Sequence, residues 1–347
     1  MSTHFCFDPN HTAHRSEPDP SRVGEHPERP ARLEAVMEHL ERAGILSQLQ
    51  ERQMPSASDE MLHLAHDPSY VKLVDSFADR GGKWIDTDTY CTAESIAIAR
   101  RAVGGLCALV DDVMTGNAAN AFALVRPPGH HARPFAAMGF CLYANAAIAA
   151  RHAQRMHSAD RVLVIDFDVH HGNGTQEVFE ADPSVLFVSS HQYPHYPGTG
   201  AIEEIGEGDA RGSTINIPVG AGTSDGDLLH LYREVVLPAA TRFNPDVVIL
   251  SAGYDAHRED PLGELMLTEA GFAALTRLAC EIAHNCAGGR IVGTLEGGYN
   301  TAALATSVAA SLNVFLNPDG DSDDIQDNPS TSAKALAQRL KVLHGLS

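Results

Sequence analysis

Five short apolar runs in this chain each end in a cluster of polar, chemically reactive side chains, and this pattern restricts the fold more than any other feature. The runs are 121–125, 161–165, 185–189, 246–251 and 291–295. Val and Ile occupy both faces of these runs, and segments with helical spacing separate them, which is typical of a parallel sheet covered by helices on both faces. The expected helices are 93–114, 139–157, 225–243, 268–286 and 302–312.

Polar side chains follow every one of these runs at the point where the run ends. In open α/β sheets the ligand crevice lies at the carboxyl ends of the strands. We therefore expect these side chains to meet at one edge of the sheet and to form an active site there. In order along the chain they are His130 and His131, Asp166, Asp168 and His170, Ser189 and Ser190, Asp255, and Tyr299.

Asp168 and His170 stand two residues apart, so both side chains leave an extended backbone on the same face. With Asp255 they would offer two carboxylates and one imidazole to a metal ion. Three protein ligands leave one position for water, which is typical of catalytic zinc, although Fe(II) also accepts this ligand set. A single Asp or His in a loop is more often a cap or a surface charge. Several acids at an apolar strand edge, however, are costly unless they are paired or bind metal.

The other strand-end residues offer the remaining groups that hydrolysis needs. A metal-activated water requires a neighbouring base and a proton donor for the leaving group. His130 and His131, in a stiff turn after two prolines, could fill these roles, and Asp166 could orient one of them by a hydrogen bond. The phenol of Tyr299, after two glycines, could donate a hydrogen bond to a developing oxyanion. The pattern therefore predicts a metal-dependent hydrolase.

Composition limits the partners that we expect. The net charge of −20 would repel a phosphate backbone, so direct nucleic-acid binding is not expected. An acidic surface suits lysine-rich tails or polyamines, but it is equally common among ordinary cytoplasmic proteins. The six cysteines form no C-x-x-C pair, which favours free thiols in a reducing compartment. We see no signal peptide and no apolar run of about 20 residues, so a cytoplasmic protein without membrane contact is expected.

We expect one catalytic domain at residues 1–316. Residues 317–332 are acidic and rich in turn-forming residues, which is typical of a linker. A short amphipathic helix at about 333–343 would follow. Residues 317–347 are thus predicted to be a linker and a C-terminal helix packed on or beside the same domain.

Four motifs in this order resemble the histone deacetylase family. They are RPPGHHA at 126–132, DFDVHHGNGTQ at 166–176, SAGYDAH at 251–257 and EGGY at 296–299. The resemblance covers about residues 20–315, and the second motif is closest to the class II branch and its bacterial histone deacetylase-like amidohydrolase relatives. It implies the arginase–deacetylase fold, in which a single eight-stranded parallel sheet carries helices on both faces.

The resemblance also implies a role for each strand-end residue. Asp168, His170 and Asp255 would be zinc ligands, His131 the general base and acid, and Tyr299 the group that polarises the acyl carbonyl. His130 would be the electrostatic partner of His131 and would pair with Asp166. A structural potassium ion is implied near the zinc, held by Asp166, Ser189 and the main-chain carbonyls of Asp168, His170 and Ser190.

A substrate tunnel and an internal channel are implied as well. Gly139, Phe140 and Tyr196 match the walls of an acyl-lysine tunnel, although plain packing is an equal alternative when these residues are judged by themselves. Leu262 matches a position at the tunnel rim, and Arg29 matches an arginine beside an internal acetate channel.

Two residues depart from the patterns of other family branches. Asn173 stands where class I members carry an Asp beside the second histidine, and this difference argues against a full second His–Asp dyad. Leu262 stands where members that prefer polyamines carry a Glu. Glu264 and the acidic loop 86–88 nevertheless leave a polyamine substrate open.

We expect hydrolysis of N-acyl amides of the acetyl-lysine type, in a peptide or protein, to a free amine and a carboxylate. An acetylpolyamine or another acylated small amine is the alternative substrate. A non-catalytic acyl-lysine binder is a third hypothesis, which the complete set of strand-end residues argues against. An arginase-like two-metal site is disfavoured because Gly253 stands where a bridging carboxylate would be needed. The sequence leaves formation of a homo-oligomer open.

Overall fold

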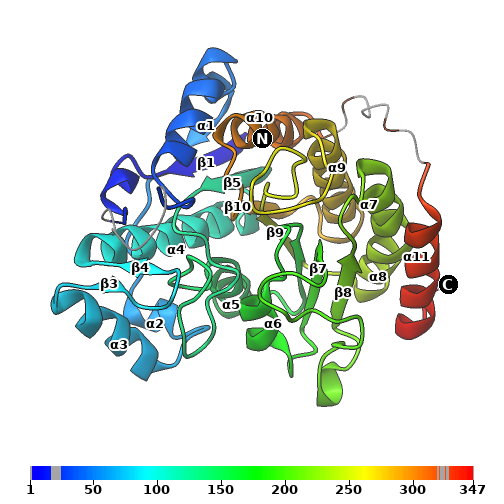
Figure 1. Ribbon diagram of the computed structural model, residues 1–347, viewed down its shortest axis with the longest axis horizontal. Coiled ribbons are helices and arrows are strands. Elements are labelled where there is room, and N and C mark those ends of the chain that lie inside the picture. Colours follow the sequence, from blue (N-terminus) through cyan, green and yellow to red (C-terminus); the bar gives the residue numbers. More distant parts are fainter. Residues whose placement is uncertain (1, 17–24, 319, 321–324, 326–327, 347) are drawn as a thin grey trace.

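The five predicted apolar runs are the five adjacent central strands of one parallel sheet (Figure 1). The computed structural model describes residues 2–16, 25–318, 320, 325 and 328–346. Its eight-stranded sheet has the order β2-β1-β5-β10-β9-β6-β7-β8, and all seven neighbouring pairs are parallel. The strands are β1 (Thr3–Phe7), β2 (Gln50–Glu51), β5 (Asn120–Leu124), β6 (Val162–Asp166), β7 (Val185–Gln192), β8 (Thr214–Val219), β9 (Val247–Ala252) and β10 (Ile291–Leu295).

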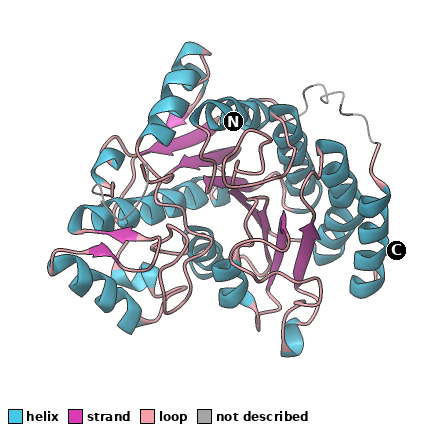
Figure 2. Cartoon of the chain, in the orientation of Figure 1, coloured by secondary structure: helices cyan, strands magenta, loops and turns pink. Residues whose placement is uncertain are grey.

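Helices cover both faces of this sheet, as the pattern predicts (Figure 2). Alternate side chains of β6 point to opposite faces of the sheet and pack with different groups of helices. Leu163 and Ile165 pack with the cluster of α1 (Ala31–Arg42), α7 (Asp225–Leu231), α8 (Leu237–Phe243), α9 (Glu269–Cys286), α10 (Thr301–Leu316) and α11 (Thr331–His344). Val162 and Val164 pack with the cluster of α2 (Asp59–Leu62), α3 (Pro68–Asp79), α4 (Ala93–Met114), α5 (Asn145–His157) and α6 (Asn173–Phe179).

Short elements complete the architecture. β3 (Lys83–Trp84) and β4 (Tyr90–Cys91) form a separate antiparallel pair. Single turns of 3-10 helix lie at His11–Ala13, Leu46–Gln48 and Gly208–Ala210, and a π-helical turn lies at Tyr232–Val236. In the described part of the chain, no helix has the length and apolar character that crossing a membrane requires. The eight-stranded parallel sheet that the resemblance implies is confirmed, including three outer strands that the apolar pattern alone missed.

Two predicted helices differ from the observed ones for local reasons. The helix predicted at 139–157 begins only at Asn145, because Gly139 and Phe140 take positive φ angles of 56° and 69° that no helix accommodates. The helix predicted at 225–243 contains a π-helical turn before Pro238. Proline has no N–H to donate to the carbonyl four residues earlier, so the regular hydrogen-bond pattern cannot continue through it.

The C-terminal helix α11 packs against α7 and β8. The backbone N–H of Ser330 donates to Asp227, and Arg242 donates to the carbonyl of His344, at 2.7 Å in both cases. Much of the predicted acidic linker, at 319, 321–324 and 326–327, lies outside the described residues.

His66 is a buried neutral imidazole whose ring nitrogens connect two segments of the chain, at Arg133 and at Ala144. Its Nδ1–H donates to the carbonyl of Arg133 at 3.0 Å, and its Nε2 accepts from the backbone N–H of Ala144 at 2.8 Å. Burial lowers the pKa of His66 to about 4. Since the unfolded chain binds this proton near pH 6.5, the residue destabilises the fold as the pH falls between these two values.

We expect His66→Gln to flatten the pH dependence of the free energy of unfolding between pH 6 and pH 4.5. A residue that titrates only when unfolded contributes a slope of about 1.4 kcal/mol per pH unit, which the variant would lose. Urea unfolding at several pH values measures this slope, and His63→Gln, at an exposed neighbouring position, is the control. Equal slopes in the wild type and His66→Gln would contradict the prediction.

Candidate active site

Parallel strands place all their carboxyl ends at one edge of the sheet, and the five central strands bring the predicted residues together there. Asp166 of β6 lies beside Ser189 of β7 and Ser251 of β9 in the sheet register. The loop after β10 approaches the loop after β6, because the backbone N–H of Gly297 donates to Asp168 at 2.8 Å. The shared edge expected from the sequence is therefore observed.

Asp168, His170 and Asp255 form a buried cluster whose ligand atoms all lie within 4.8 Å of one another. His170 Nδ1 lies 3.0 Å from an oxygen of Asp168 and 3.2 Å from an oxygen of Asp255. The backbone N–H of Val169 donates to the other oxygen of Asp255 at 2.8 Å. The two carboxylates are thus oriented by backbone donors, with one oxygen of each aimed at the imidazole.

The electrostatics of this cluster fit a divalent cation. Burial and the neighbouring charge of Asp168 raise the pKa of Asp255 to about 7. Burial lowers the pKa of His170, but hydrogen bonds with Asp168 and Asp255 outweigh it and raise that pKa to about 10. Two buried carboxylates facing one imidazole nitrogen are costly without a compensating positive charge. A Zn²⁺ ion matches this donor set and would balance the charge.

His130 and His131 lie beside the cluster, with ring centroids 4.0 Å apart. Nδ1 of His130 is 3.0 Å from Asp166, and nearby Asp168 and Asp166 raise the pKa of His130 well above its usual value, although burial opposes this shift. Burial and the charges of His130 and His170 hold the pKa of His131 well below its usual value. One imidazole of the pair is therefore charged and the other neutral, an arrangement that separates an electrostatic role from a proton-accepting role.

Asn173 sets the tautomer of His131. The side-chain oxygen of Asn173 lies 2.8 Å from His131 Nδ1, so it accepts the Nδ1–H and leaves Nε2 with a free lone pair. An amide accepts this hydrogen bond without adding a negative charge. The substitution noted in the sequence thus leaves the orientation of His131 intact and removes a charge that would raise its pKa.

Tyr299 is half-buried, and its ring packs edge-on against Phe140 at a centroid distance of 5.7 Å. The guanidinium carbon of Arg32 lies 4.9 Å from the centroid of the Tyr299 ring. Arg32 also donates to the carbonyls of Gly298 and Glu296 at 2.6 Å each. The arginine beside Tyr299 is therefore Arg32.

The prediction for Arg29 is not met by its position. Its side chain is 41% exposed and forms an ion pair with Glu25, four residues earlier in the chain. Arg32 was missed because it stands three residues later, in the apolar stripe that Leu33, Val36 and Leu40 form on α1. An arginine inside a buried helical stripe is itself a signal, since such a charge requires fixed partners.

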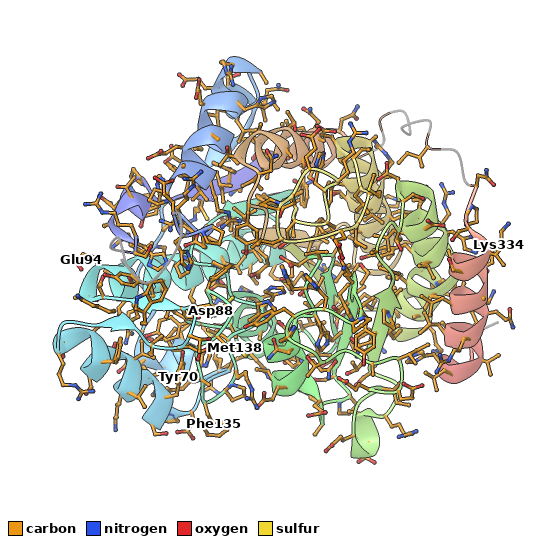
Figure 3. The ribbon with its side chains drawn as sticks, in the orientation of Figure 1. Tyr70, Asp88, Glu94, Phe135, Met138 and Lys334 are labelled. Atoms are coloured by element: carbon orange, nitrogen blue, oxygen red, sulfur yellow. The ribbon has the colours of Figure 1, made fainter. Side chains whose placement is uncertain are left out.

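Two of the predicted tunnel residues, Gly139 and Tyr196, lie against His131. The ring of Tyr196 meets that of His131 edge-on at 5.2 Å, and a side chain added at Gly139 would overlap the His131 ring. The backbone N–H of Gly139 donates to Asp88 at 3.1 Å, which fixes the strained turn before Phe140. Figure 3 shows Asp88 next to Met138, the residue before this turn.

The backbone of Leu262 is connected to the metal cluster by the ring of His195. The His195 ring stacks on that of His170 at 5.2 Å, and its Nε2–H donates to the carbonyl of Leu262 at 3.0 Å. At the proposed potassium position, Ser189 is 3.0 Å from His191 and Ser190 is 2.9 Å from Tyr232. The sheet register places Ser189 beside Asp166, and the ion itself stays a prediction.

A cavity of about 650 Å³ lies elsewhere, at the opposite edge of the sheet. It is lined by the first residues of β5 and β10, Asn120 and Ile291, and by Arg277 and Arg290. None of the predicted site residues lines it. The candidate active site therefore rests on converging side chains at the carboxyl edge and not on the volume of a cavity.

Comparison with known proteins gives a consistent result over most of the chain. The model of the histone deacetylase domain matches residues 26–315. Histone deacetylase 14, chloroplastic, from Arabidopsis thaliana is 40% identical over 92% of this chain and 81% of its own length. Polyamine deacetylase HDAC10 from Homo sapiens is 39% identical over 83% of this chain and 44% of its own length. The crystal structure of the HDA15 HD domain superposes with a TM-score of 0.92 at 38% identity, covering 99% of this chain and 94% of that one.

Gly297 offers a test of the metal cluster. A side chain at this position would overlap the carboxylate oxygens of both Asp255 and Asp168. We expect Gly297→Ala to weaken zinc binding by ~10-fold or more, because ligand carboxylates displaced from their positions lose coordination geometry. Competition with a fluorescent chelator measures the affinity. Gly220→Ala is the control, since nothing lies within 4 Å of the added atom there. Unchanged affinity in Gly297→Ala would exclude Asp168 and Asp255 as the ligands.

Proposed function

The chain belongs to the histone deacetylase family and is a deacetylase of the hydrolase class, and on this premise we propose that it uses zinc to hydrolyse N-acyl amides of the acetyl-lysine type. The observation that carries the proposal is the buried set of Asp168, His170 and Asp255 next to a charged and a neutral imidazole. The products are a free amine and a carboxylate. Fe²⁺ would also fit these ligands.

Activation of the attacking water requires a Lewis acid and a proton acceptor, and His131 is the acceptor. Asp168, His170 and Asp255 would hold the zinc ion, which would supply Lewis acidity toward the acyl carbonyl and the attacking water. His131 accepts the proton of that water at Nε2, because its Nδ1–H is already engaged by Asn173. It then passes the proton to the leaving amine. His130, held charged by Asp166, stabilises the negative charge that develops during the attack.

Tyr299 stabilises the oxyanion. Burial raises the pKa of its phenol well above the usual value, so the hydroxyl stays protonated and can donate a hydrogen bond. Gly298, with a φ of 117°, permits the backbone turn that presents this ring. Arg32 positions the same loop through the carbonyls of Gly298 and Glu296, and we assign to it the place beside an acetate channel first expected for Arg29.

The substrate enters between aromatic walls formed by Phe140 and Tyr196, with Gly139 at the base of the slot and Leu262 at its rim. The close approach of Tyr196 to His131 and of Phe140 to Tyr299 supports this path. A narrow aromatic slot suits the straight alkyl chain of an acylated lysine. Potassium bound by Asp166, Ser189 and the carbonyls of Asp168, His170 and Ser190 would hold the loop that carries the zinc ligands.

An acetylpolyamine is the second candidate substrate. A relative of 39% identity bears the name polyamine deacetylase, and burial together with the charges of Asp88 and Asp86 raises the pKa of the Tyr196 phenol, which places both acids near the tunnel. Leu262 at the rim, and Glu264 accepting a hydrogen bond from Gln192 at 2.9 Å, favour the lysine substrate. We place the enzyme in the cytoplasm without direct nucleic-acid or membrane partners, although the Arabidopsis relative is named chloroplastic. Assembly into a homo-oligomer stays open.

Turnover before and after removal of metal tests the function. We expect activity on fluorogenic acetyl-lysine peptides to disappear with a chelator and to return with zinc, because the metal supplies the Lewis acid. Trifluoroacetyl-lysine and longer acyl-lysine peptides rank the acyl preference, and competition with acetylputrescine separates lysine from polyamine substrates. Full activity after complete removal of metal would refute the zinc mechanism.

Tyr299→Phe is expected to lower turnover by about 10²- to 10³-fold, since it removes one donor to the developing oxyanion. The bound zinc should remain, because the phenol is not a ligand. Steady-state kinetics together with metal content measure the two effects, and Tyr193→Phe, at an exposed position in another loop, is the control. Unchanged turnover would remove Tyr299 from the mechanism.

A further inference from the structure

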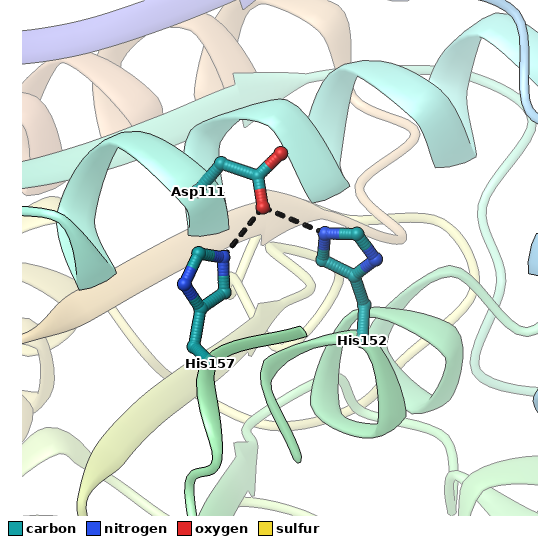
Figure 4. Close-up of side chains that lie close together, drawn as sticks. All are labelled: Asp111, His152 and His157. Carbon is teal, nitrogen blue, oxygen red and sulfur yellow. Dashed lines mark hydrogen bonds and ion pairs between the residues drawn. The ribbon is translucent and has the colours of Figure 1, made fainter. Parts of the chain in front are cut away.

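Asp111, His152 and His157 form a second cluster of metal-type ligands (Figure 4). Asp111 lies near the end of α4, and the two histidines lie on α5, with His157 as its last residue. One oxygen of Asp111 is 2.8 Å from Nε2 of His152 and 2.6 Å from Nε2 of His157. Three donor atoms from two packed helices thus converge on one point.

This cluster is remote from the candidate active site. The side chain of Asn145, the first residue of α5, donates to the carbonyl of Pro127, in the turn that leads to His130 and His131. His157 lies twelve residues further along the helix, about 18 Å away at the usual helical rise. The two ends of α5 therefore lie at different sites, the first near the catalytic histidines and the last at the second cluster.

The exposure of the three residues suits a bound ion. The side chains of His152 and His157 are only 7% and 17% exposed, whereas that of Asp111 is 45% exposed. Two imidazoles are thus held in place by the surrounding helices, while the carboxylate side is open to water. Burial raises the pKa of Asp111, but the hydrogen bonds from the histidines outweigh it, so the carboxylate is ionised at neutral pH.

We propose that Asp111, His152 and His157 bind a divalent transition-metal ion of the Zn²⁺ type that links α4 to α5. Two imidazole nitrogens and one carboxylate oxygen are ligands that zinc accepts, whereas Ca²⁺ and Mg²⁺ prefer oxygen ligands only. Each neutral imidazole frees its Nε2 by carrying its proton on Nδ1. Water fills the remaining position on the exposed side.

Small movements are enough to admit the ion. Ligand atoms around a tetrahedral zinc lie about 3.3 Å apart, given bond lengths near 2.0 Å. The Asp111 oxygen must therefore recede by roughly half an ångström from each imidazole, and a half-exposed side chain can make this shift. The two imidazole nitrogens, which lie within 4.8 Å of each other, must also reach this spacing. The bound ion would replace two hydrogen bonds by coordination bonds and hold together two helices that cover one face of the sheet.

The number of zinc ions bound to the full-length chain tests this proposal. Equilibrium dialysis at micromolar free Zn²⁺, followed by elemental analysis, should find one ion fewer in His157→Gln than in the wild type. Asp111→Asn, which keeps the size of the exposed side chain, should give the same loss. His284→Gln, at an exposed position in the last turn of α9, is the control and should keep the wild-type count.

The difference in the number of bound zinc ions between the wild type and each variant decides the result, and the total number does not. A wild-type count of two with one ion in each variant supports this site and a separate catalytic ion. A wild-type count of one with none in the variants supports this site and counts against zinc at Asp168, His170 and Asp255. Equal counts in the wild type and in both variants overturn the proposal. Zinc should also raise the melting temperature of His157→Gln less than that of the wild type, and equal increases would overturn it as well.

Discussion

Buried carboxylates at the ends of the central strands are the constraint on which the rest of this structure depends. Asp166, Asp168, Asp255 and Glu296 are all shielded from water, and each would destabilise the fold without a partner. Glu296 accepts the backbone N–H groups of Gly129 and His130 at 2.6 and 3.0 Å. Backbone donors and imidazoles thus stabilise the negative charge and at the same time orient the groups that do the chemistry.

A second layer of paired charges holds the loops that carry these groups. Glu28 accepts from Arg126 at 2.6 and 2.8 Å and from Arg32 at 3.1 Å, and all three side chains are buried. Arg126 follows β5 after one intervening residue, whereas Arg32 donates to the carbonyls of Glu296 and Gly298 after β10. One carboxylate therefore fixes the relative position of two loops, one with the paired histidines and the other with Tyr299.

Much of this arrangement could be predicted because the signals are local. Five Val- and Ile-rich runs followed by Asp, His or Tyr specify both the strands and the edge at which the site forms. β1, β2 and β8 carried weaker signals, since β2 has two residues and β8 contains a proline. The motif alone favours Arg29, and only the apolar stripe of α1, into which Arg32 falls, indicates which arginine turns inward. The sequence carries no signal for the cluster of Asp111, His152 and His157, since only the packing of α4 on α5 brings them together.

The position of β10 in the sheet has a consequence for how the protein is made. β10 comes last of the eight strands in the chain but lies between β5 and β9, where Gly293 leaves room for the ring of Phe122. Until the ribosome has released residues 291–295, β5 and β9 lack the neighbour that separates them, and their inner edges stay unpaired. Such edges invite pairing with other chains. The catalytic arrangement can therefore form only after residues 291–295 have left the ribosome, although four of the five strands that carry its residues precede them in the chain.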